Sequence, residues 1–133
     1  MELSNSPTVI IAEDDFVIRE GMLKSLLEPQ FTIVASVDSG QDAITAAAEH
    51  NPTIVLLDIS LPEVAGFDAA RQILADHPDC KVLFVSNYRD RGYVGNAKEM
   101  GASGYVLKWR AESDLVPAIE AALAGDFYQS NFY

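Results

Sequence analysis

The sequence predicts a single α/β domain in which a parallel sheet is covered by helices on both faces. Its five short apolar runs are strand-sized and mostly do not alternate with polar residues, which is typical of strands buried on both sides. Segments with helical spacing separate the runs, so β-α repeats five times and calls for an open, doubly wound (βα)5 sheet with right-handed crossovers. The predicted strands are Thr8 to Ala12, Phe31 to Ser36, Thr53 to Leu57, Lys81 to Val85 and Gly104 to Leu107.

The helices are predicted from apolar residues at intervals of three and four and from the residues that end them. In the first helix Ile18, Met22 and Leu26 fall on one face, and the helix has to end before Pro29. Pro117 fits only near the first turn of the fifth helix. The other helices are expected around Ala43 to Ala47, Phe67 to Ala75, Asp90 to Met100 and Asp114 to Ala124.

The 133 residues are expected to form one domain around one core, because a chain of this length has no room for two. No repeat, low-complexity tract or internal linker divides the chain. The core is predicted to run from about residue 7 to about residue 125. Roughly the first six residues and the tail 126–133 are predicted to be loose, and the tail is interpreted as a free end or as the start of a linker to an output domain.

Composition and charge exclude several classes of function. The formal net charge of −11 would repel nucleic acid and anionic membranes, since phosphate binding requires clustered Lys and Arg. No apolar run approaches the roughly 20 residues of a membrane-spanning helix. The first residues lack the features of a targeting segment, so a cytoplasmic location is expected. Cys80, the single cysteine, excludes an intramolecular disulfide and is expected to be a small buried hydrophobe.

Reactive polar residues follow four of the five predicted strands. Glu13 and Asp14 follow the first strand, Asp58 the third, Ser86 the fourth and Lys108 the fifth. In open α/β sheets ligands bind outside the carboxyl ends of the strands, so these residues should converge at one edge. Any one of them alone is better explained as a helix cap, a turn residue or a solvated charge. Agreement among four strand ends favours a functional site.

Three carboxylates at one edge repel one another, and a bound divalent cation would remove that repulsion. Because the ligands are oxygens only, the expected cofactor is a hard cation, Mg²⁺ or alternatively Mn²⁺, and zinc is disfavoured. Such a metal bridges a carboxylate and an incoming phosphoryl group, while Ser86 and Lys108 neutralise charge on the phosphoryl oxygens. The residues therefore predict Asp58 as the nucleophile that accepts a phosphoryl group.

The motifs IIAEDDFVIREG, IVLLDISLPEVAG, VLFVS and GASGYVLK resemble the receiver domains of two-component response regulators, over nearly the whole chain. The resemblance implies a flavodoxin-like sheet of strand order 2-1-3-4-5 and a Mg²⁺-dependent phosphoryl transfer to Asp58 from a sensor histidine kinase. It implies that Glu13 and Asp14 bind the metal together with Asp58 and the backbone carbonyl of Ser60. On the same pattern Asp15 is a first-turn residue of the first helix and not a further ligand.

The resemblance also implies how the domain would switch. Ser86 matches the switch hydroxyl, Tyr105 the switch aromatic and Lys108 the lysine that contacts the phosphoryl group. Phosphorylation is expected to draw in Ser86 and to open space into which Tyr105 rotates, which reshapes the face around the fourth helix and the fifth strand. Gly92 and Gly95 weaken that helix. Lys108→Ala is expected to keep the fold, because its partner charge is expected only after phosphorylation.

The phrases REG, GASGYVLK and AIEAALAG further resemble the subgroup with NarL-type (LuxR-output) DNA-binding domains. This implies control of transcription by an output domain outside this chain, and a freestanding receiver that binds a protein partner is the alternative. A phosphorylation-dependent homodimer is compatible with the resemblance, but the pattern indicates no face for it. Trp109 departs from the family pattern and is interpreted as core packing or, alternatively, as a partner-facing anchor. The geometry of the Lys108 to Trp109 peptide bond stays open.

Three rival functions are compatible with parts of the pattern. A phosphatase of the haloacid-dehalogenase kind also uses an Asp nucleophile after a parallel strand, but it needs a second Asp where this chain has Ser60. A flavodoxin-like cofactor module needs a phosphate-cradling loop after the first strand, where Glu13, Asp14 and Asp15 would repel phosphate. A receiver-like domain that no longer accepts phosphate is disfavoured, because no signature position is missing.

Overall fold

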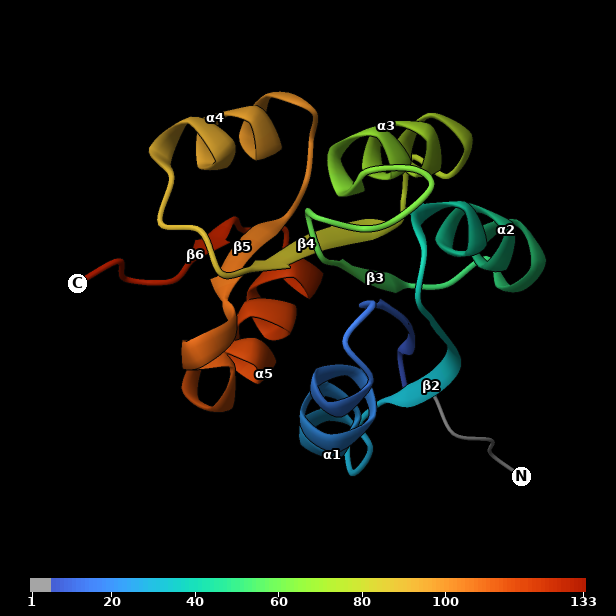
Figure 1. The fold of residues 1–133 in the computed structure, drawn as a ribbon, viewed down its shortest axis with the longest axis horizontal. Coiled ribbons are helices and arrows are strands. Elements are labelled where there is room, and N and C mark those ends of the chain that lie inside the picture. The colour runs from blue at the N-terminus through green and yellow to red at the C-terminus, as the bar shows by residue number, and fades with distance from the viewer. Residues whose placement is uncertain (1–5) are drawn as a thin grey trace.

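Strands and helices alternate along the chain in the computed structural model, which describes residues 6–133 (Figure 1). The predicted loose start therefore lies outside the described residues, apart from Ser6. The strands are β1 Thr8–Ala12, β2 Thr32–Val37, β3 Ile54–Leu57, β4 Lys81–Ser86, β5 Gly104–Leu107 and β6 Tyr128–Gln129. The helices are the π-helical η1 Val17–Leu23, α1 Lys24–Leu27, α2 Gly40–His50, α3 Gly66–Asp76, α4 Arg91–Glu99, the 3-10 helix η2 Lys108–Arg110 and α5 Ala111–Leu123.

The strands form one parallel sheet of order β2-β1-β3-β4-β5-β6. The predicted doubly wound (βα)5 fold and its order 2-1-3-4-5 are confirmed, and each predicted strand lies within one residue of its expected bounds. The short β6 is an addition at the edge beside β5. Its two residues carry no periodicity, so the sequence contains no signal for it.

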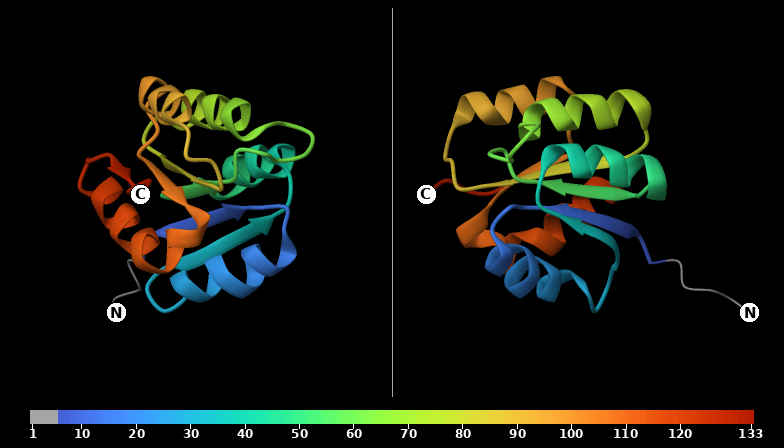
Figure 2. Two further views of the ribbon diagram at one scale, coloured as in Figure 1. Left: turned by 60° about the vertical axis from the view of Figure 1, so that its left-hand side comes forward. Right: turned by 45° about the vertical axis from the view of Figure 1, so that its right-hand side comes forward.

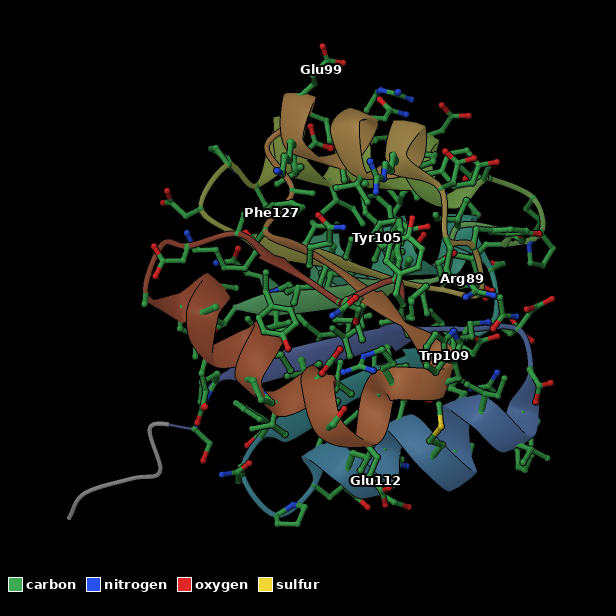
Figure 3. All side chains as sticks on the ribbon, turned by 90° about the vertical axis from the view of Figure 1, so that its left-hand side faces the viewer. Arg89, Glu99, Tyr105, Trp109, Glu112 and Phe127 are labelled. Carbon is green, nitrogen blue, oxygen red and sulfur yellow. The ribbon has the colours of Figure 1, made fainter. Side chains whose placement is uncertain are left out.

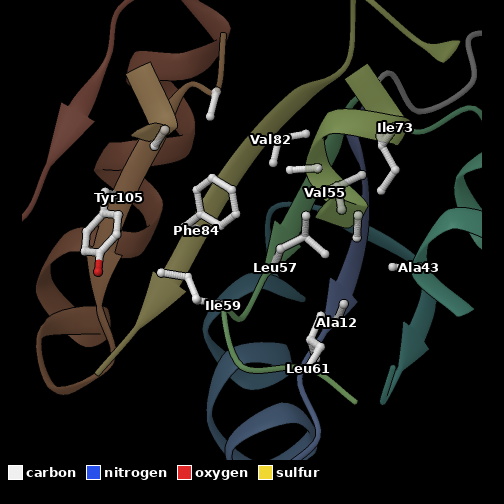
Figure 4. Packing of buried hydrophobic residues seen from close by; sticks show 14 of the residues in the cluster. Ala12, Ala43, Val55, Leu57, Ile59, Leu61, Ile73, Val82, Phe84 and Tyr105 are labelled. Atoms are coloured by element: carbon white, nitrogen blue, oxygen red, sulfur yellow. The ribbon is translucent and has the colours of Figure 1, made fainter. Parts of the chain in front are cut away.

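Helices cover both faces of the sheet, with α2, α3 and α4 on one face and η1, α1 and α5 on the other (Figures 1 and 2). Successive strand residues point to opposite faces. Ile10 therefore packs in the layer under α2 and α3, whereas Val9 and Ile11 pack in the layer over α1 and α5. Figure 4 shows the first layer, in which Phe84 and Tyr105 lie side by side on neighbouring strands. Burial on both faces explains why the apolar runs do not alternate.

Two further sequence predictions concern burial and membranes. Cys80 is buried, and burial raises the pKa of its thiol to about 11, so it acts as the small hydrophobe that we expected. None of the helices in the described part of the chain is long and apolar enough to cross a bilayer.

The fifth helix begins earlier than the sequence predicts. Helical backbone runs on from Lys108 through η2 into α5, so Pro117 lies inside the helix and not in its first turn. A proline at that position cannot donate a hydrogen bond to the carbonyl of Ser113, four residues earlier. Both residues are exposed, so water can bond the freed carbonyl oxygen.

The C-terminal tail packs against the domain, and the prediction that it is loose is wrong. Phe132 and Ser130 are 5% and 1% exposed. The Ser130 hydroxyl donates to Asp114 Oδ2 at 2.6 Å and accepts a hydrogen bond from Leu107 N at 3.0 Å. The tail therefore supplies a buried polar anchor between α5 and the end of β5, which no short sequence motif reveals.

Asp114 is the acceptor in that anchor. Burial by itself would raise the pKa of Asp114, but hydrogen bonds from Ser130, Arg110, Tyr128 and Ser113 outweigh burial and hold it below its usual value. A carboxylate with a depressed pKa stabilises the folded state while it is ionised, and the stabilisation is lost as pH falls through the folded-state pKa.

We expect Asp114→Ala to lower the free energy of unfolding at pH 7 by about 1–3 kcal/mol, because the buried Ser130 hydroxyl loses its acceptor. The difference from wild type should shrink as pH falls below 3.8, the ordinary pKa of the group. Urea unfolding at several pH values measures both effects. Glu112→Ala, an exposed acidic position on the same helix, is the control and should change little. Equal stability of the Asp114 variant and the control would contradict the anchor.

Candidate functional site

Glu13 and Asp14 lie where the chain leaves β1. Glu13 N still donates to Val37 O of β2 at 3.0 Å, so the sheet sets its position. Its Oε2 accepts a hydrogen bond from Asp15 N at 3.0 Å, and Arg19 Nη1 donates to the Glu13 carbonyl oxygen at 2.7 Å. Glu13 is 1% exposed, whereas Asp14 is exposed. The turn thus presents one buried and one surface carboxylate at the same edge.

Asp15 has a different role from its two neighbours. Its Oδ1 accepts hydrogen bonds from Val17 N at 2.9 Å and Ile18 N at 3.1 Å, which caps the first turn of the helix. One oxygen of its carboxylate is therefore engaged at the start of the helix, and the exclusion of Asp15 from the metal ligands stays a prediction.

Asp58 follows β3, and its backbone is held from two sides. Asp58 N donates to Ala12 O of β1 at 3.0 Å. Gly66 opens α3 so close by that a Cβ at that position would lie 2.2 Å from Asp58 O. Gly66 N also donates to Ile59 O at 2.8 Å. Only glycine allows this approach, so residue 66 fixes the turn that presents the Asp58 carboxylate.

The structure brings the predicted acidic residues together. One carboxylate oxygen from each of Glu13, Asp14 and Asp58 lies within 4.8 Å of the others. Lys108, the first residue after β5, reaches into the same cluster, with its Nζ 2.7 Å from Glu13 Oε1 and 3.2 Å from Asp58 Oδ2. Residues at the ends of three separate strands therefore meet at the carboxyl edge of the sheet, as the sequence predicted.

These ion pairs correct our expectation that Lys108 gains a partner charge only after phosphorylation. The Lys108 side chain is 9% exposed and already pairs with both Glu13 and Asp58. Burial alone would lower the pKa of Lys108, but the close contact with Glu13 and the negative charges of Asp58 and Glu13 outweigh burial and raise it. Lys108 is therefore a charged structural member of the cluster, and removing it leaves buried carboxylates without compensation.

The residues present fit a divalent cation. Burial, assisted by the nearby charge of Asp58, raises the pKa of Glu13 although Lys108 and Asp15 N act in the opposite direction. Among the described residues, Glu13 Oε1 is a buried oxygen without an aligned hydrogen bond, even though Lys108 Nζ is close. Three carboxylates and one ammonium leave two formal negative charges, and all the donors are oxygens, which suits Mg²⁺ or Mn²⁺. The Ser60 carbonyl stays a predicted ligand.

Tyr88 borders the cluster, and the sequence did not single it out. Its hydroxyl lies 3.5 Å from Ser60 Oγ, and its backbone nitrogen donates to Ser86 Oγ at 2.9 Å. Its backbone oxygen accepts a hydrogen bond from Tyr105 OH at 2.6 Å. Tyrosine in a loop carries no chemical signature, so the contact depends on the fold.

Ser86 and Tyr105 form the predicted switch pair and are both fully buried. Tyr105 OH lies within hydrogen-bonding distance of Ser86 Oγ, at 3.2 Å, and burial raises the pKa of Tyr105 to about 12. The Tyr105 ring points inward, into the layer beneath α4 (Figure 4). The contacts of the Ser86 hydroxyl are with Tyr88 and Tyr105, and its movement towards Asp58 stays a prediction.

Trp109 is 56% exposed, so its interpretation as core packing is wrong. Successive side chains of η2 point in different directions, so Lys108 turns towards the carboxylates while Trp109 turns outward. The centroid of the Trp109 ring lies 5.9 Å from the Arg89 guanidinium carbon (Figure 3) and 5.6 Å from the guanidinium carbon of Arg110. The peptide bond from Lys108 to Trp109 is trans. The interpretation as a partner-facing anchor stays open.

We expect Gly66→Ala to lower the free energy of unfolding by about 1–3 kcal/mol, because the added methyl group would overlap the Asp58 backbone. Chemical denaturation measures this loss. Gly95→Ala in α4 is the matched control, since a Cβ there meets nothing within 4 Å and should stabilise the helix by about 1 kcal/mol. A Gly66 variant as stable as wild type would show that the turn after Asp58 is not tightly packed.

We expect Lys108→Ala to lower the midpoint of thermal unfolding in metal-free buffer, because Glu13 and Asp58 lose their shared counter-charge. Added Mg²⁺ should then raise the midpoint more in the variant than in wild type, since a cation that binds only the folded state restores the balance. Lys98→Ala, at an exposed lysine of α4, should behave as wild type does. Identical midpoints and identical Mg²⁺ responses in all three proteins would refute the role of Lys108.

Comparison with known proteins agrees with this geometry. The model of the response regulator receiver domain matches residues 9–120. The transcriptional regulatory protein DegU of Brevibacillus brevis is 35% identical over 125 residues, which are 93% of this chain and 53% of DegU. The chain thus spans about half the length of the curated relatives it matches.

Solved structures give the same result. A LuxR-family DNA-binding response regulator from Staphylococcus aureus is 35% identical with a TM-score of 0.79, covering 86% of this chain and 96% of that one. The receiver domain of the putative response regulator NarL from Mycobacterium tuberculosis is 26% identical with a TM-score of 0.83, covering 92% of this chain and 99% of that one. This chain therefore belongs to the family of response regulator receiver domains, a family of signalling domains, and its relatives include regulators of the NarL and LuxR type.

Proposed function

We propose that Asp58 accepts a phosphoryl group from a sensor histidine kinase in a Mg²⁺-dependent reaction, and that the face formed by α4 and β5 changes in response. The observation that carries this proposal is the convergence of Asp58 with two further carboxylates and the Lys108 ammonium at one edge of the sheet. Family membership supports it, because receiver domains are typically phosphorylated on an aspartate.

In the proposed transfer one carboxylate oxygen of Asp58 forms a bond to phosphorus, while the bond from phosphorus to the donor's histidine nitrogen breaks. Glu13, Asp14, Asp58 and the Ser60 carbonyl would hold the cation, which when bound lowers the charge repulsion between the carboxylates and the phosphoryl oxygens. Lys108 Nζ lies 3.2 Å from Asp58 Oδ2, close enough to neutralise charge that develops on the incoming group.

The response would begin at Ser86. Its hydroxyl sits at the end of β4 and is shared with Tyr88 N and Tyr105 OH. Phosphoryl oxygens at Asp58 add negative charge and strong acceptors, which favour a donor hydroxyl turned towards them. Tyr105 OH keeps its hydrogen bond to Tyr88 O, so the inward ring is compatible with a Ser86 that has moved. The inward position of the Tyr105 ring is therefore the one that we expect phosphorylation of Asp58 to favour.

Control of transcription through a DNA-binding domain outside this chain is the output that the NarL and LuxR relatives favour. The domain itself, with a net charge of −11, is a poor match for nucleic acid. The single-domain interpretation, with the tail as the beginning of a linker, is part of the same proposal, as is a phosphorylation-dependent homodimer. Ser60 in place of a second aspartate disfavours the rival interpretation as a phosphatase.

Incubation with a radiolabelled phosphodonor tests the proposal. We expect wild-type protein to take up label in the presence of Mg²⁺, and expect Asp58→Asn or chelation of the metal to abolish it, because the amide is not a nucleophile and the carboxylates repel the donor. Asp79→Asn, at an exposed acid remote from the cluster, should label as wild type does. Persisting label on the Asp58→Asn variant would refute Asp58 as the acceptor.

A further inference from the structure

Residues 128–132, here called the strap, consist of β6 and the three residues that follow it. The strap lies along the outer edge of β5, where Gln129 pairs with Tyr105 in parallel register. Ser130 N donates to the Tyr105 carbonyl oxygen at 2.9 Å. The strap is therefore hydrogen-bonded to the backbone of the residue whose side chain is the proposed switch.

The strap also packs against the Tyr105 ring. Phe132 is 5% exposed and belongs to the same buried cluster as Tyr105 and Val94 of α4. The ring centroids of Phe132 and Tyr105 are 6.1 Å apart at an angle of 62°, an edge contact of the kind that aromatic pairs prefer. A Tyr105 ring that left the inward position would give up this contact and would uncover the Phe132 ring.

Arg89 connects the strap to the loop that holds the Tyr105 hydroxyl. Its Nη1 donates to the Phe132 carbonyl oxygen at 3.2 Å, and its guanidinium lies over the Trp109 ring (Figure 3). The preceding residue, Tyr88, accepts the hydrogen bond from Tyr105 OH. One loop therefore fixes both the inward ring and the end of the strap.

A buried anchor keeps the strap in register. The Ser130 hydroxyl bonds both Asp114 Oδ2 and Leu107 N, and Leu107 directly precedes Lys108 of the acidic cluster. A slip by one residue would remove Ser130 from this site and leave a buried carboxylate with fewer donors. Ser130 therefore sets the register in which the strap docks beside β5.

We propose that the strap stabilises the inward Tyr105, so that docking of the strap and binding of a phosphoryl group at Asp58 strengthen each other. The inference rests on the proposed function, because it needs the phosphoryl group to favour the inward ring. Two events that favour one conformation have to be coupled in both directions. Phe132 is accordingly a positioning residue for the switch, although it lies outside the acidic cluster.

The two directions of the coupling are separately measurable. Calorimetric titration with beryllium fluoride and Mg²⁺, a phosphoryl mimic, gives its affinity for the complete chain. Phe132→Ala should weaken this affinity at least about fivefold. Phe127→Ala is the matched control. Its ring belongs to the same tail, packs against the same buried cluster and lies under Lys98, but the ring contact with Tyr105 is made by Phe132, so the affinity should stay unchanged. Hydrogen exchange of wild type should show slower exchange at the Ser130 and Leu107 amides when the mimic is bound.

Equal affinities of the Phe132 and Phe127 variants, or exchange at the Ser130 amide that is unaffected by the mimic, would overturn the coupling. The exchange measurement needs only wild-type protein, so it decides the question even if Phe132→Ala does not fold. If wild-type protein binds the mimic but amide exchange in the strap does not change, only the coupling between the strap and phosphoryl binding is refuted. Wild type that fails to bind the mimic at all would refute the proposed function and the strap with it.

Discussion

The charge balance at the carboxyl edge of the sheet is the interaction on which the rest of the site depends. Three strands end in ionisable groups there, and Lys108 Nζ lies between Glu13 and Asp58 at 2.7 and 3.2 Å. Without that ammonium, buried carboxylates would face one another in a region that water barely reaches. With it, the cluster keeps two formal negative charges, which is the charge that a divalent cation complements.

The molecule holds this edge firmly and the helix of its proposed response face, α4, lightly. Asp58 is fixed by a hydrogen bond to Ala12 O and by the close approach of Gly66. By contrast, α4 is nine residues long, contains two glycines and fully buries only Val94 and Ala97. A firmly held Asp58 beside a weakly held helix suits the proposed function, in which Asp58 accepts a phosphoryl group and the face around α4 then changes shape.

At the edge of the sheet beside β5, the residues near the acidic cluster contact the C-terminal tail. Tyr105 bonds Ser86 on the side of the acceptor, and its backbone and ring contact Ser130 and Phe132 on the side of the tail. Trp109 and Arg89 lie at the surface of the same region. The acidic cluster is joined to the last residues of the chain through Lys108, which pairs with Asp58 and directly follows Leu107, whose amide donates to Ser130. Strand β2 lies at the opposite edge of the sheet.

The sequence by itself determined the doubly wound fold, the five strands of its main sheet and the residues of the acidic cluster. It could do so because apolar runs are local, and because parallel strands bring the residues that follow them to one edge whatever the details of packing. Only the tertiary structure decided that Lys108 is already ion-paired, that Trp109 faces outward, and that the tail docks as β6 with Phe132 buried. These features depend on contacts between segments far apart in the chain, and a local pattern contains no information about which distant side chain fills a given space.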